Sequence, residues 1–340
     1  MFKRVLAMAL AAMMMVSVVG CSGGSGEAQT NGEKAAKGVS EKDSEVKWPK
    51  NVEIVVPGSA GGDTDFNARM LAKELTEKLP ANFVVTNISG NGGATATRQV
   101  KDADNDGSSV LFYHTAFLVN KASGTSDYGF EAYNFASIAA ENVGNVVTVN
   151  ASLGINTLEE LYQYTQEHPG ELKMAAQTGA TSFAVATQMK NAGFNVNIVD
   201  AGSAADRLTA LLGGHVDVIL AAYGSVKDYV TEGTLIPLAM DGENDLVVEE
   251  QNINIKTLKN QGYDIKLPFY YFFAFPAGTN DELIDQFNAV LKDIIENNTD
   301  YQKQIYDAYY QHPMFMPREE GLAKYTEIEN MLNELDFSIK

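Results

Sequence analysis

From residue 51 onward, segments with the pattern of a buried strand alternate with segments with the pattern of an amphipathic helix. An apolar run at 52–56 is followed by a stretch in which Phe66, Leu79 and the apolar residues between them share one helical face. Phe83–Val85 and Val110–Tyr113 have the composition of two further strands, with a short helix between them. This β-α-β-α-β alternation predicts a parallel sheet with right-handed crossovers.

A second block with the same alternation begins near Asn150. Thr157 is expected to cap a helix, and Ser203 with Asp206 forms a capping-box pair at the start of another. A third block, from about Gln261, contains an aromatic strand and then helices that run to the C-terminus. The pattern therefore predicts two similar α/β lobes, with the tail of the chain returning to the first.

The first residues have the composition of an export signal. Lys3 and Arg4 precede an apolar run, Val5–Val19, that is short for a membrane span. The run ends in Val-Val-Gly-Cys at 18–21, which resembles a bacterial lipoprotein cleavage box. We therefore expect a lipoprotein signal peptide at 1–20 and lipidation (palmitate) of Cys21, with an ordinary secretory signal and an incidental cysteine as the alternative.

The polar tract at 21–47 is rich in Gly, Ser, Glu, Lys, Asn and Ala and has almost nothing to bury. Such a composition does not repay the entropy of ordering, so we expect a flexible tether. The folded part is expected to begin near Trp48. What remains is long enough for two domains rather than one.

The formal net charge is −19, and removal of a signal that contains Lys3 and Arg4 lowers it by two, to −21. Such a chain repels nucleic acid and anionic membrane surfaces. It also offers no long-range attraction to an anionic ligand, so any bound anion must be held by local groups.

The stretch VVPGSAGGDTD, residues 55–65, joins a predicted strand to a predicted helix. Glycines let the backbone turn sharply and bring the unpaired N–H groups of the helix start close to a ligand, which favours anion binding. No Lys-Ser or Lys-Thr follows the glycines, so the loop is not a Walker loop. The alternative is a tight turn with Asp63 or Thr64 as N-cap and no ligand.

A loop of the same kind, QTGATSF at 177–183, occurs in the second block. Two such loops, one in each lobe, are what a ligand held between the lobes would need. A third glycine-rich stretch, SGNGGATA at 89–96, has Thr95 where a dinucleotide fingerprint requires its third glycine, so no nucleotide cofactor is expected.

Signatures of catalysis and of metal binding are missing from the sequence. There is no HExxH, CxxC or G-x-S-x-G motif. Asp63 and Asp65 suit helix capping better than an acid–base pair. We therefore expect neither an enzyme nor a metal site, and no cofactor. The four histidines are scattered: His114, His168, His215 and His312.

Several segments, in their order along residues 50–335, resemble the extracytoplasmic solute receptors of tripartite tricarboxylate transporters, the Bug or tricarboxylate-receptor type. These segments are VVPGSAGGDTDFNARMLAKEL, VVTNISGNGGATA, VVTVN leading into TLEEL, HPGELKMAAQTG, DRLTALLGGHVDV, TLKNQGYD and FPAGTNDEL. Each segment alone is moderately specific, and their order and spacing are much more so.

The resemblance implies a two-lobed α/β periplasmic-binding-protein fold of type II with two hinge crossovers. Lobe 1 is expected at 48–148 plus 263–340 and lobe 2 at 149–262. The function implied is that of a monomeric, lipid-anchored receptor on the extracytoplasmic face of the cell membrane. It would bind a small organic carboxylate and deliver it to large and small permease subunits.

Members of this family hold carboxylates largely through main-chain N–H groups, hydroxyls and ordered water. Carried over residue by residue, the expected ligand-binding residues come from the two loops and from the ends of other strands. They are Ser59, Ala60, Gly61, Gly62, Asp63, Thr64, Asp65, Thr115, Thr178, Gly179, Ala180, Thr181, Ser182, Asp200 and Tyr223.

This sequence departs from the family pattern at several positions, and these departures bear on which ligand it binds. The family usually has glycine where Asp63 stands, glycine in place of Phe272 and tryptophan in place of Tyr270, and its D-G-Y-T is Asp-Gly-Ser-Ser at 106–109 here. A carboxylate beside an anion weakens binding unless it is paired or points away. One alternative is therefore a receptor for an amino-bearing, neutral or aromatic ligand that serves another transporter or a sensor. A group-transfer enzyme ranks below it.

Overall fold

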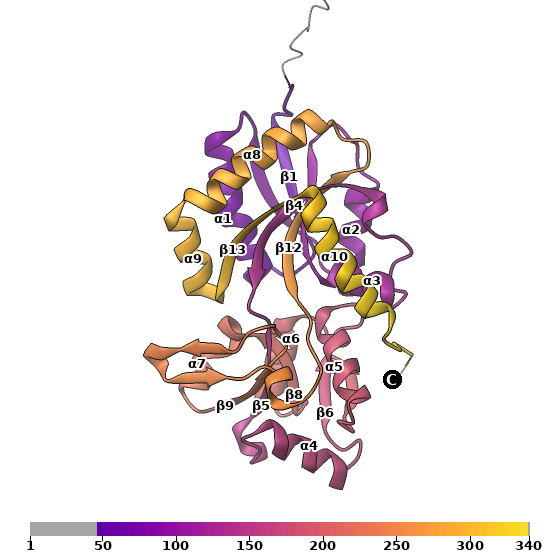
Figure 1. The fold of residues 1–340 in the computed structure, drawn as a ribbon, viewed down its shortest axis with the longest axis vertical. Helices are drawn as coiled ribbons and strands as arrows, with labels where there is room; N and C mark the ends of the chain where they lie inside the picture. The colour runs from indigo at the N-terminus through magenta and orange to yellow at the C-terminus, as the bar shows by residue number, and fades with distance from the viewer. Residues whose placement is uncertain (1–45, 339–340) are drawn as a thin grey trace, which may run out of the picture. The chain divides into compact units, whose positions relative to one another are not determined.

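The computed structural model describes residues 46–338, which belong to one compact unit. The predicted signal peptide, Cys21 and nearly all of the predicted tether lie outside the described residues. Two separate sheets, each with its own helices, form two lobes, here called lobe 1 and lobe 2 (Figure 1).

Lobe 1 is built on a six-stranded sheet in the order β13-β4-β12-β3-β1-β2. Its strands are β1 (Asn51–Val56), β2 (Asn82–Asn87), β3 (Ser109–His114), β4 (Tyr133–Asn142), β12 (Phe269–Pro276) and β13 (Gln311–Pro317). Strands β1, β2 and β3 run parallel, as the alternation predicts, whereas β12 is antiparallel to β3 and β4, and β13 is antiparallel to β4.

Six helices belong to the lobe 1 part of the described chain, and the last three come from the C-terminal part, as expected for a tail that returns to the first lobe. They are α1 (Asp63–Lys78), α2 (Ala94–Lys101), α3 (Ala116–Ala122), α8 (Asp281–Asn297), α9 (Thr299–Tyr309) and α10 (Arg318–Asn333). Short 3-10 turns lie at Asn91–Gly93 and Phe130–Ala132.

Lobe 2 is built on a five-stranded sheet in the order β7-β6-β8-β5-β9, in which β6 runs parallel to β7 and β8. Its strands are β5 (Asn145–Asn150), β6 (Lys173–Ala176), β7 (Asn197–Asp200), β8 (Val218–Ala222) and β9 (Leu235–Met240). Its helices are α4 (Leu158–Glu167), α5 (Thr181–Asn191), α6 (Ala204–Leu212) and α7 (Tyr223–Thr231). A hairpin of β10 (Leu246–Val248) and β11 (Ile253–Ile255) follows, and 3-10 turns lie at Ala151–Leu153, Glu249–Gln251 and Lys259–Gln261.

The predicted caps of two lobe 2 helices are present. Thr157 accepts a hydrogen bond from the N–H of Glu160, whose side chain returns to the Thr157 backbone, and this capping box starts α4. Ser203 and Asp206 form the same box at the start of α6. Both helices therefore begin where the local sequence indicates.

The chain passes between the lobes twice. The first crossover joins β4 to β5 between Asn142 and Asn145, and the second runs from Met240 to Phe269. Because β5 pairs with β8 and β9, the chain enters the lobe 2 sheet at Asn145, a few residues before the boundary expected at 148/149. The boundary expected at 262/263 falls inside the second crossover.

An edge strand interrupts the C-terminal region, where the sequence predicts only helices. Strand β13 pairs with β4 alone and contains Pro313 and Pro317. Proline has no N–H to donate, so it is tolerated at the edge of a sheet and excluded from its centre. The prolines therefore suit the position that β13 occupies.

The aromatic strand β12 is buried along its whole length, as the sequence predicts. Its alternate residues point to opposite faces of the sheet, so Phe273 packs against Phe287 of α8 at a ring distance of 5.0 Å, while Phe272 packs against Phe117 of α3 at 5.7 Å. Full burial of one such side chain contributes about 1.5–3 kcal/mol. This strand is the centre of the lobe 1 core.

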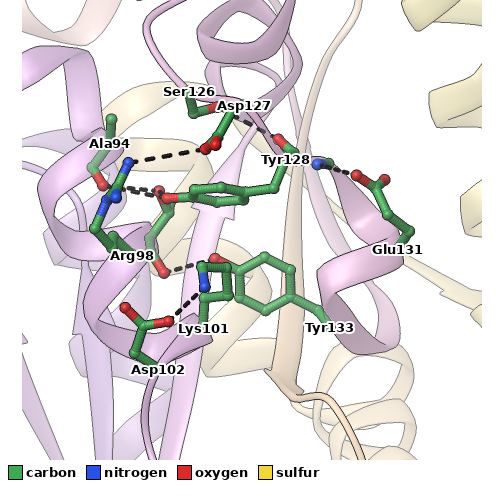
Figure 2. Close-up of polar contacts among 11 residues, drawn as sticks. Ala94, Arg98, Lys101, Asp102, Ser126, Asp127, Tyr128, Glu131 and Tyr133 are labelled. Carbon is green, nitrogen blue, oxygen red and sulfur yellow. Dashed lines mark hydrogen bonds and ion pairs between the residues drawn. The ribbon is translucent and has the colours of Figure 1, made fainter.

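Helix α2 is held to the rest of lobe 1 by two tyrosines (Figure 2). The Tyr133 hydroxyl donates to the carbonyl of Thr97 at 2.6 Å. The charged ends of Arg98 and Lys101 lie 5.8 and 5.5 Å from the centre of the Tyr128 ring, within reach of cation–π attraction. These contacts fix the direction in which the N-terminus of α2 points.

Across residues 46–338 no helix is both long and apolar enough to cross a bilayer. The same part of the chain contains no group of three or more His, Cys, Asp or Glu side chains placed to hold a metal ion.

Candidate functional site

A cavity of about 410 Å³ lies between the lobes, at the ends of strands from both sheets. Lobe 1 contributes the predicted loop at 57–65, the glycine-rich stretch after β2, and His114 at the end of β3. Lobe 2 contributes the loop after β6 and the starts of α6 and α7. We call this cavity the cleft.

Helix N-termini without a side-chain cap surround the cleft. Gly62, Gly93, Ala180 and Ala222 are the N-cap residues of α1, α2, α5 and α7, and no side chain caps any of these helices. All four N-cap residues line the cleft. The first turn of a helix carries unpaired N–H groups and the positive end of the helix dipole, so this arrangement favours an anion.

Caps are present at three of the helices that start elsewhere and missing at two, α3 and α10, whose N-cap residues Thr115 and Pro317 do not line the cleft. Thr157, Asn280 and Asn298 cap α4, α8 and α9, and none of them lines the cleft. Helix α6 is capped by Ser203, which does line the cleft. Of the six helices of residues 46–338 that lack a side-chain cap, four therefore start at the cleft.

Asp65 belongs to the first loop, and its carboxylate contacts Gly61 of the same loop. One carboxylate oxygen accepts from the N–H of Gly61 at 2.8 Å and from Arg69 at 3.0 Å, and the other lies 2.9 Å from the Arg69 guanidinium. Burial opposes ionisation, yet the hydrogen bonds from Arg69 and Gly61 leave the pKa of Asp65 below its usual value. The ionised Asp65 is thus neutralised inside the loop.

Asp63 is also tied to groups of lobe 1. Its carboxylate accepts a hydrogen bond from the Tyr271 hydroxyl and a longer one, 3.4 Å, from the amide of Asn142 at the first crossover. Gln311 donates to the Asp63 carbonyl at 3.2 Å. Burial raises the pKa of Asp63, and the hydrogen bonds only partly oppose that rise. The carboxylate is therefore paired, which is the condition under which an acid can stand beside an anion site.

The only basic side chain in the described lining of the cleft is that of Arg207 on α6. It is buried, and it donates to the carbonyls of Gly202 at 2.7 Å and Leu220 at 3.1 Å. Burial lowers its pKa to about 10, a shift that Asp200 and Asp206 oppose, so it stays cationic at neutral pH. It adds positive potential to the lobe 2 wall.

His114 and Phe269 form the apolar part of the cleft wall. Their rings stack with centroids 4.3 Å apart, and the His114 Nδ1 accepts from the N–H of Ala116. Burial lowers the pKa of His114 to about 3, so the ring is neutral. It contributes shape and no charge.

The lobes touch on two sides of the cleft. On one side the Asn120 amide donates to the carbonyls of Gly92, at 3.0 Å, and Gly179, at 2.6 Å. On the other side Gly224 of α7 lies so close to α9 that a Cβ atom there would stand 2.4 Å from the carbonyl oxygen of Ala308. The structure therefore has its two lobes in contact around the cleft.

Nine of the predicted site residues line the cleft, and they are Ser59, Ala60, Gly61, Gly62, Asp63, Thr64, Asp65, Ala180 and Thr181. The other six are not in its lining. They are Thr115, Thr178, Gly179, Ser182, Asp200 and Tyr223.

These six residues have other partners. Thr178 and Gly179 contact Gly92 of lobe 1, and Asp200 accepts from the N–H of Thr178 at 3.0 Å. The hydroxyl oxygens of Ser182 and Thr115 each accept a backbone N–H, and the Tyr223 hydroxyl donates to the side chain of Gln251. Thr178, Gly179, Ser182 and Asp200 thus hold the second loop, whereas Thr115 and Tyr223 bond to segments outside both loops.

Sequence reasoning missed several residues of the lining. Tyr309, from the end of α9, donates to the Gly61 carbonyl at 2.8 Å, and nothing local in the sequence places it beside a loop 248 positions away. Ser203 had a usable signal, because it follows a strand and starts a helix like the two predicted loops. Other missed lining residues are Ser89, His114, Asn145, Gln177, Arg207, Ser225 and Phe269.

Residues 67–315 match the family described as "Tripartite tricarboxylate transporter family receptor". The first loop, which ends at Asp65, precedes the matched part. A protein from Pseudomonas sp. strain P51, named for the tcbD-tcbE intergenic region, is 25% identical over 71% of this chain and 72% of its own length. Protein BugT of Bordetella pertussis is 24% identical over 72% of this chain and 76% of its own length.

Solved structures share the fold. The periplasmic binding protein BugD superposes with a TM-score of 0.73 at 23% identity, over 84% of this chain and 97% of that one. MatC from Rhodopseudomonas palustris, with bound malate, gives 0.73 at 19% identity over 84% and 99%. An R. palustris protein with adipate gives 0.72 at 21% over 83% and 95%. The chain thus has the two-lobed fold of periplasmic binding proteins.

Proposed function

The chain belongs to the tripartite tricarboxylate transporter receptor family, a family of solute receptors rather than enzymes, and we propose that its ligand is a small organic carboxylate held in the cleft. The observation that carries this proposal is the set of four helices, α1, α2, α5 and α7, whose uncapped N-termini line the cleft from both lobes. Malate and adipate, bound by two proteins of the same fold, belong to this ligand class.

The net charge of the molecule implies that a bound anion is held by groups in its immediate surroundings. With a net charge of −19, the chain as a whole repels an anion. Unpaired N–H groups and helix dipoles act within the first helical turn, where the screening that weakens distant charges has little effect. The carboxylate would therefore be held by the loop backbones, with Arg207 as the one cationic neighbour in the described lining.

The two acids of the first loop do not oppose this ligand. Asp65 is neutralised by Arg69, and Asp63 is hydrogen-bonded by Tyr271 and Asn142. Of the predicted site residues, the nine that line the cleft are proposed as the contact set, and Thr178, Gly179, Ser182 and Asp200 as supports of the second loop.

Delivery to a membrane transporter and membrane attachment are further parts of the proposal. Closure of the two lobes, which are joined by the crossovers at 142–145 and 240–269, would bury the ligand and present one closed form to large and small permease subunits. Lipidated Cys21, following a signal peptide at 1–20, would hold a monomeric receptor at the extracytoplasmic face of the cell membrane through the tether at 21–47. Nearly all of these N-terminal residues precede the described part, which begins at Val46.

The ligand test combines native mass spectrometry of the purified protein with a thermal-shift screen. Organic acids, including malate and adipate, are compared with their uncharged amides and with amino-bearing and aromatic compounds. A ligand at 100 times its dissociation constant stabilises the fold by about 2.7 kcal/mol. We expect a melting-temperature rise for at least one acid and none for its amide, and a rise only with neutral or cationic compounds would refute the carboxylate proposal.

The anchor is tested separately. Cells that express the full chain are labelled with palmitate, and the same is done with Cys21→Ala. We expect label and membrane fractionation for the natural sequence and loss of both in the variant. Equal fractionation of the two would contradict lipidation and leave the ligand proposal untouched.

A further inference from the structure

A second cavity, of about 620 Å³, lies on the side of the molecule where the second crossover runs, and it shares no lining residue with the cleft. Its walls come from the end of α5, from the crossover segment 264–268 and from α10. Cavities of about 300–1,000 Å³ hold small organic molecules. We call it the hinge cavity.

The hinge cavity carries an excess of negative charge. Four carboxylates line it against two lysines, Lys266 and Lys324. Each lysine pairs with one acid, Lys266 with Glu243 at 2.9 Å and Lys324 with Glu327 at 3.3 Å. The remaining two acids, Asp264 and Glu334, are exposed and have no ion-pair partner within residues 46–338, so the described lining carries two more negative than positive charges.

The helices that reach the hinge cavity do so with their C-termini. Ala192, the C-cap of α5, and Glu334, the C-cap of α10, both line it. A helix C-terminus carries the negative end of the dipole and favours a cation. The hinge cavity is therefore electrostatically opposite to the cleft, where helix N-termini gather.

Two polar side chains at this cavity are buried without a partner. Tyr270 is 4% exposed, and its hydroxyl makes no hydrogen bond to any described residue. Gln188 is 8% exposed, and its amide nitrogen is buried and unpaired within the described part of the chain. The unpaired Tyr270 hydroxyl oxygen can accept a hydrogen bond from an ammonium ion, whereas the Gln188 amide nitrogen is a donor and needs an acceptor, so only Tyr270 bears on a cationic ligand.

Three carboxylates lie near enough to the Tyr270 hydroxyl to affect its pKa. Burial raises the pKa of Tyr270 to about 12, with further contributions from the charges of Glu141, Glu243 and Glu327. Glu141 lies behind the cavity wall, and its own pKa is raised by burial and by Glu243 and lowered by Lys324. An aromatic face close to carboxylates is a favourable environment for an organic cation.

Apart from Asn191, the rest of the wall is apolar. Ile265, Pro268, Ile328, Met331 and Leu335 line the cavity. The described residues contain no cluster of three metal-ligating side chains, so a bare metal ion would lack ligands there. The wall suits a carbon skeleton that carries the charge.

We propose that the hinge cavity is a second binding site, which takes a small organic ammonium ion with an apolar body. The ammonium group lies near Tyr270 and the carboxylates Glu243 and Glu327, and the apolar body packs against Ile328 and Met331. This site is separate from the carboxylate site of the proposed function and takes the opposite charge.

The experiment is a calorimetric titration of the full mature chain with benzylamine at low ionic strength, with benzyl alcohol as the uncharged isostere. We expect saturable binding of one benzylammonium per chain, at least about tenfold tighter than the alcohol. The double variant Glu243→Gln/Glu327→Gln is expected to weaken amine binding about fivefold or more. Glu319→Gln, on the same helix α10 but outside the cavity, is the matched control and should bind as the natural chain does.

Three results would each overturn the proposal: no saturable binding of benzylamine, equal binding of amine and alcohol, or the same loss in Glu319→Gln as in the double variant. Displacement of the amine by an organic acid would place it in the cleft and would also refute the site. The double variant leaves the cleft unchanged, so we expect it to bind the cleft ligand with the affinity of the natural chain. A failure of the hinge-cavity proposal can therefore be told apart from a failure of the proposed function.

Discussion

Asn120 of α3 in lobe 1 donates a hydrogen bond of 2.6 Å to the carbonyl of Gly179 in lobe 2. Opposite this contact, Gly224 of α7 lies against Ala308 of α9 with no room for a Cβ atom. The cleft lies between the two contacts. The contact between the lobes on both sides of the cleft therefore depends on a close approach of the backbones at Gly179 and Gly224, where the side chain is a single hydrogen.

Gly224→Ala is expected to block closure and leave each lobe folded. Gly224 lies inside α7, where alanine is favoured over glycine by up to about 1 kcal/mol, but its Cβ would stand 2.4 Å from the Ala308 oxygen. We predict that the melting temperature without ligand is kept and that cleft affinity falls at least about tenfold. Calorimetry and small-angle scattering measure the two effects.

The matched control is Asp228→Ala, an exposed position on the same helix that changes helix propensity and meets no opposing lobe. It should leave cleft affinity within about twofold of the natural value. Equal affinity of Gly224→Ala and Asp228→Ala would show that the contact with α9 plays no part in closure.

Asp241 is expected to give the protein an unusual pH dependence. Its buried carboxylate accepts from the N–H and the amide of Asn145, the latter at 2.9 Å, and its carbonyl accepts from the N–H of Leu267. It therefore joins both crossovers. Burial raises its pKa from 3.8 to about 7.

A raised pKa in the folded state means that Asp241 contributes its full stability below pH 3.8 and loses it as pH rises through about 7. Asp241→Asn cannot ionise. We compare the free energy of unfolding of the natural chain with that of the variant. We predict that this difference falls by up to about 4 kcal/mol between pH 4 and 7 and stays constant at higher pH. Urea unfolding at several pH values measures it, and parallel pH curves would contradict the buried ionisation.

Ala180→Asp is expected to change stability and binding in opposite directions. Ala180 is the uncapped N-cap of α5, and its extended backbone is the one that a capping side chain needs. A carboxylate there would cap the helix, raising the free energy of unfolding by about 1 kcal/mol, and would occupy the N–H groups proposed for the ligand. We predict at least about a tenfold loss of carboxylate affinity.

Ala180→Asn separates the cap from the charge. It should give most of the stability gain with a smaller loss of affinity, because its side chain competes for the N–H groups without repelling the ligand. If Ala180→Asp is more stable and binds the acid unchanged, the α5 N-terminus is not part of the carboxylate site.

Asp63→Asn tests the acid at the first loop. The amide oxygen that the substitution introduces could still accept from the Tyr271 hydroxyl, so the fold should lose at most about 1 kcal/mol. Because Asp63 is bound to Tyr271 and Asn142, we predict that no ligand loses affinity and that dicarboxylates gain about two- to fivefold. A loss of tenfold or more for an amino-bearing ligand in calorimetry would instead show direct contact with Asp63.

The sequence predicted correctly those features that depend on residues close together in the chain. The capping boxes at Thr157 and Ser203 lie within four consecutive residues each, so both helix starts were predictable. The first loop could be found for the same reason, because a strand, a glycine turn and a helix start follow one another directly.

Non-local pairing was not predictable. Strands β4 and β13 are antiparallel partners from distant parts of the chain, and no short-range signal joins Gln311 to Asn142. Tyr309 reaches the cleft only because β13 folds back beside β4 and carries the end of α9 with it. Thr178 and Gly179 lie in a recognisable loop, but their contact with Gly92 depends on how the lobes meet.

The most direct measurement is a calorimetric titration of the natural chain with the best organic acid from the screen and with the amide of that acid. If the helix N-termini that line the cleft bind the ligand, one acid should bind per chain and the binding should be saturable. The amide should bind at least about a hundredfold more weakly, because these N-termini select the negative charge of the ligand. Equal affinity for the acid and its amide, or no binding of any acid, would contradict this prediction.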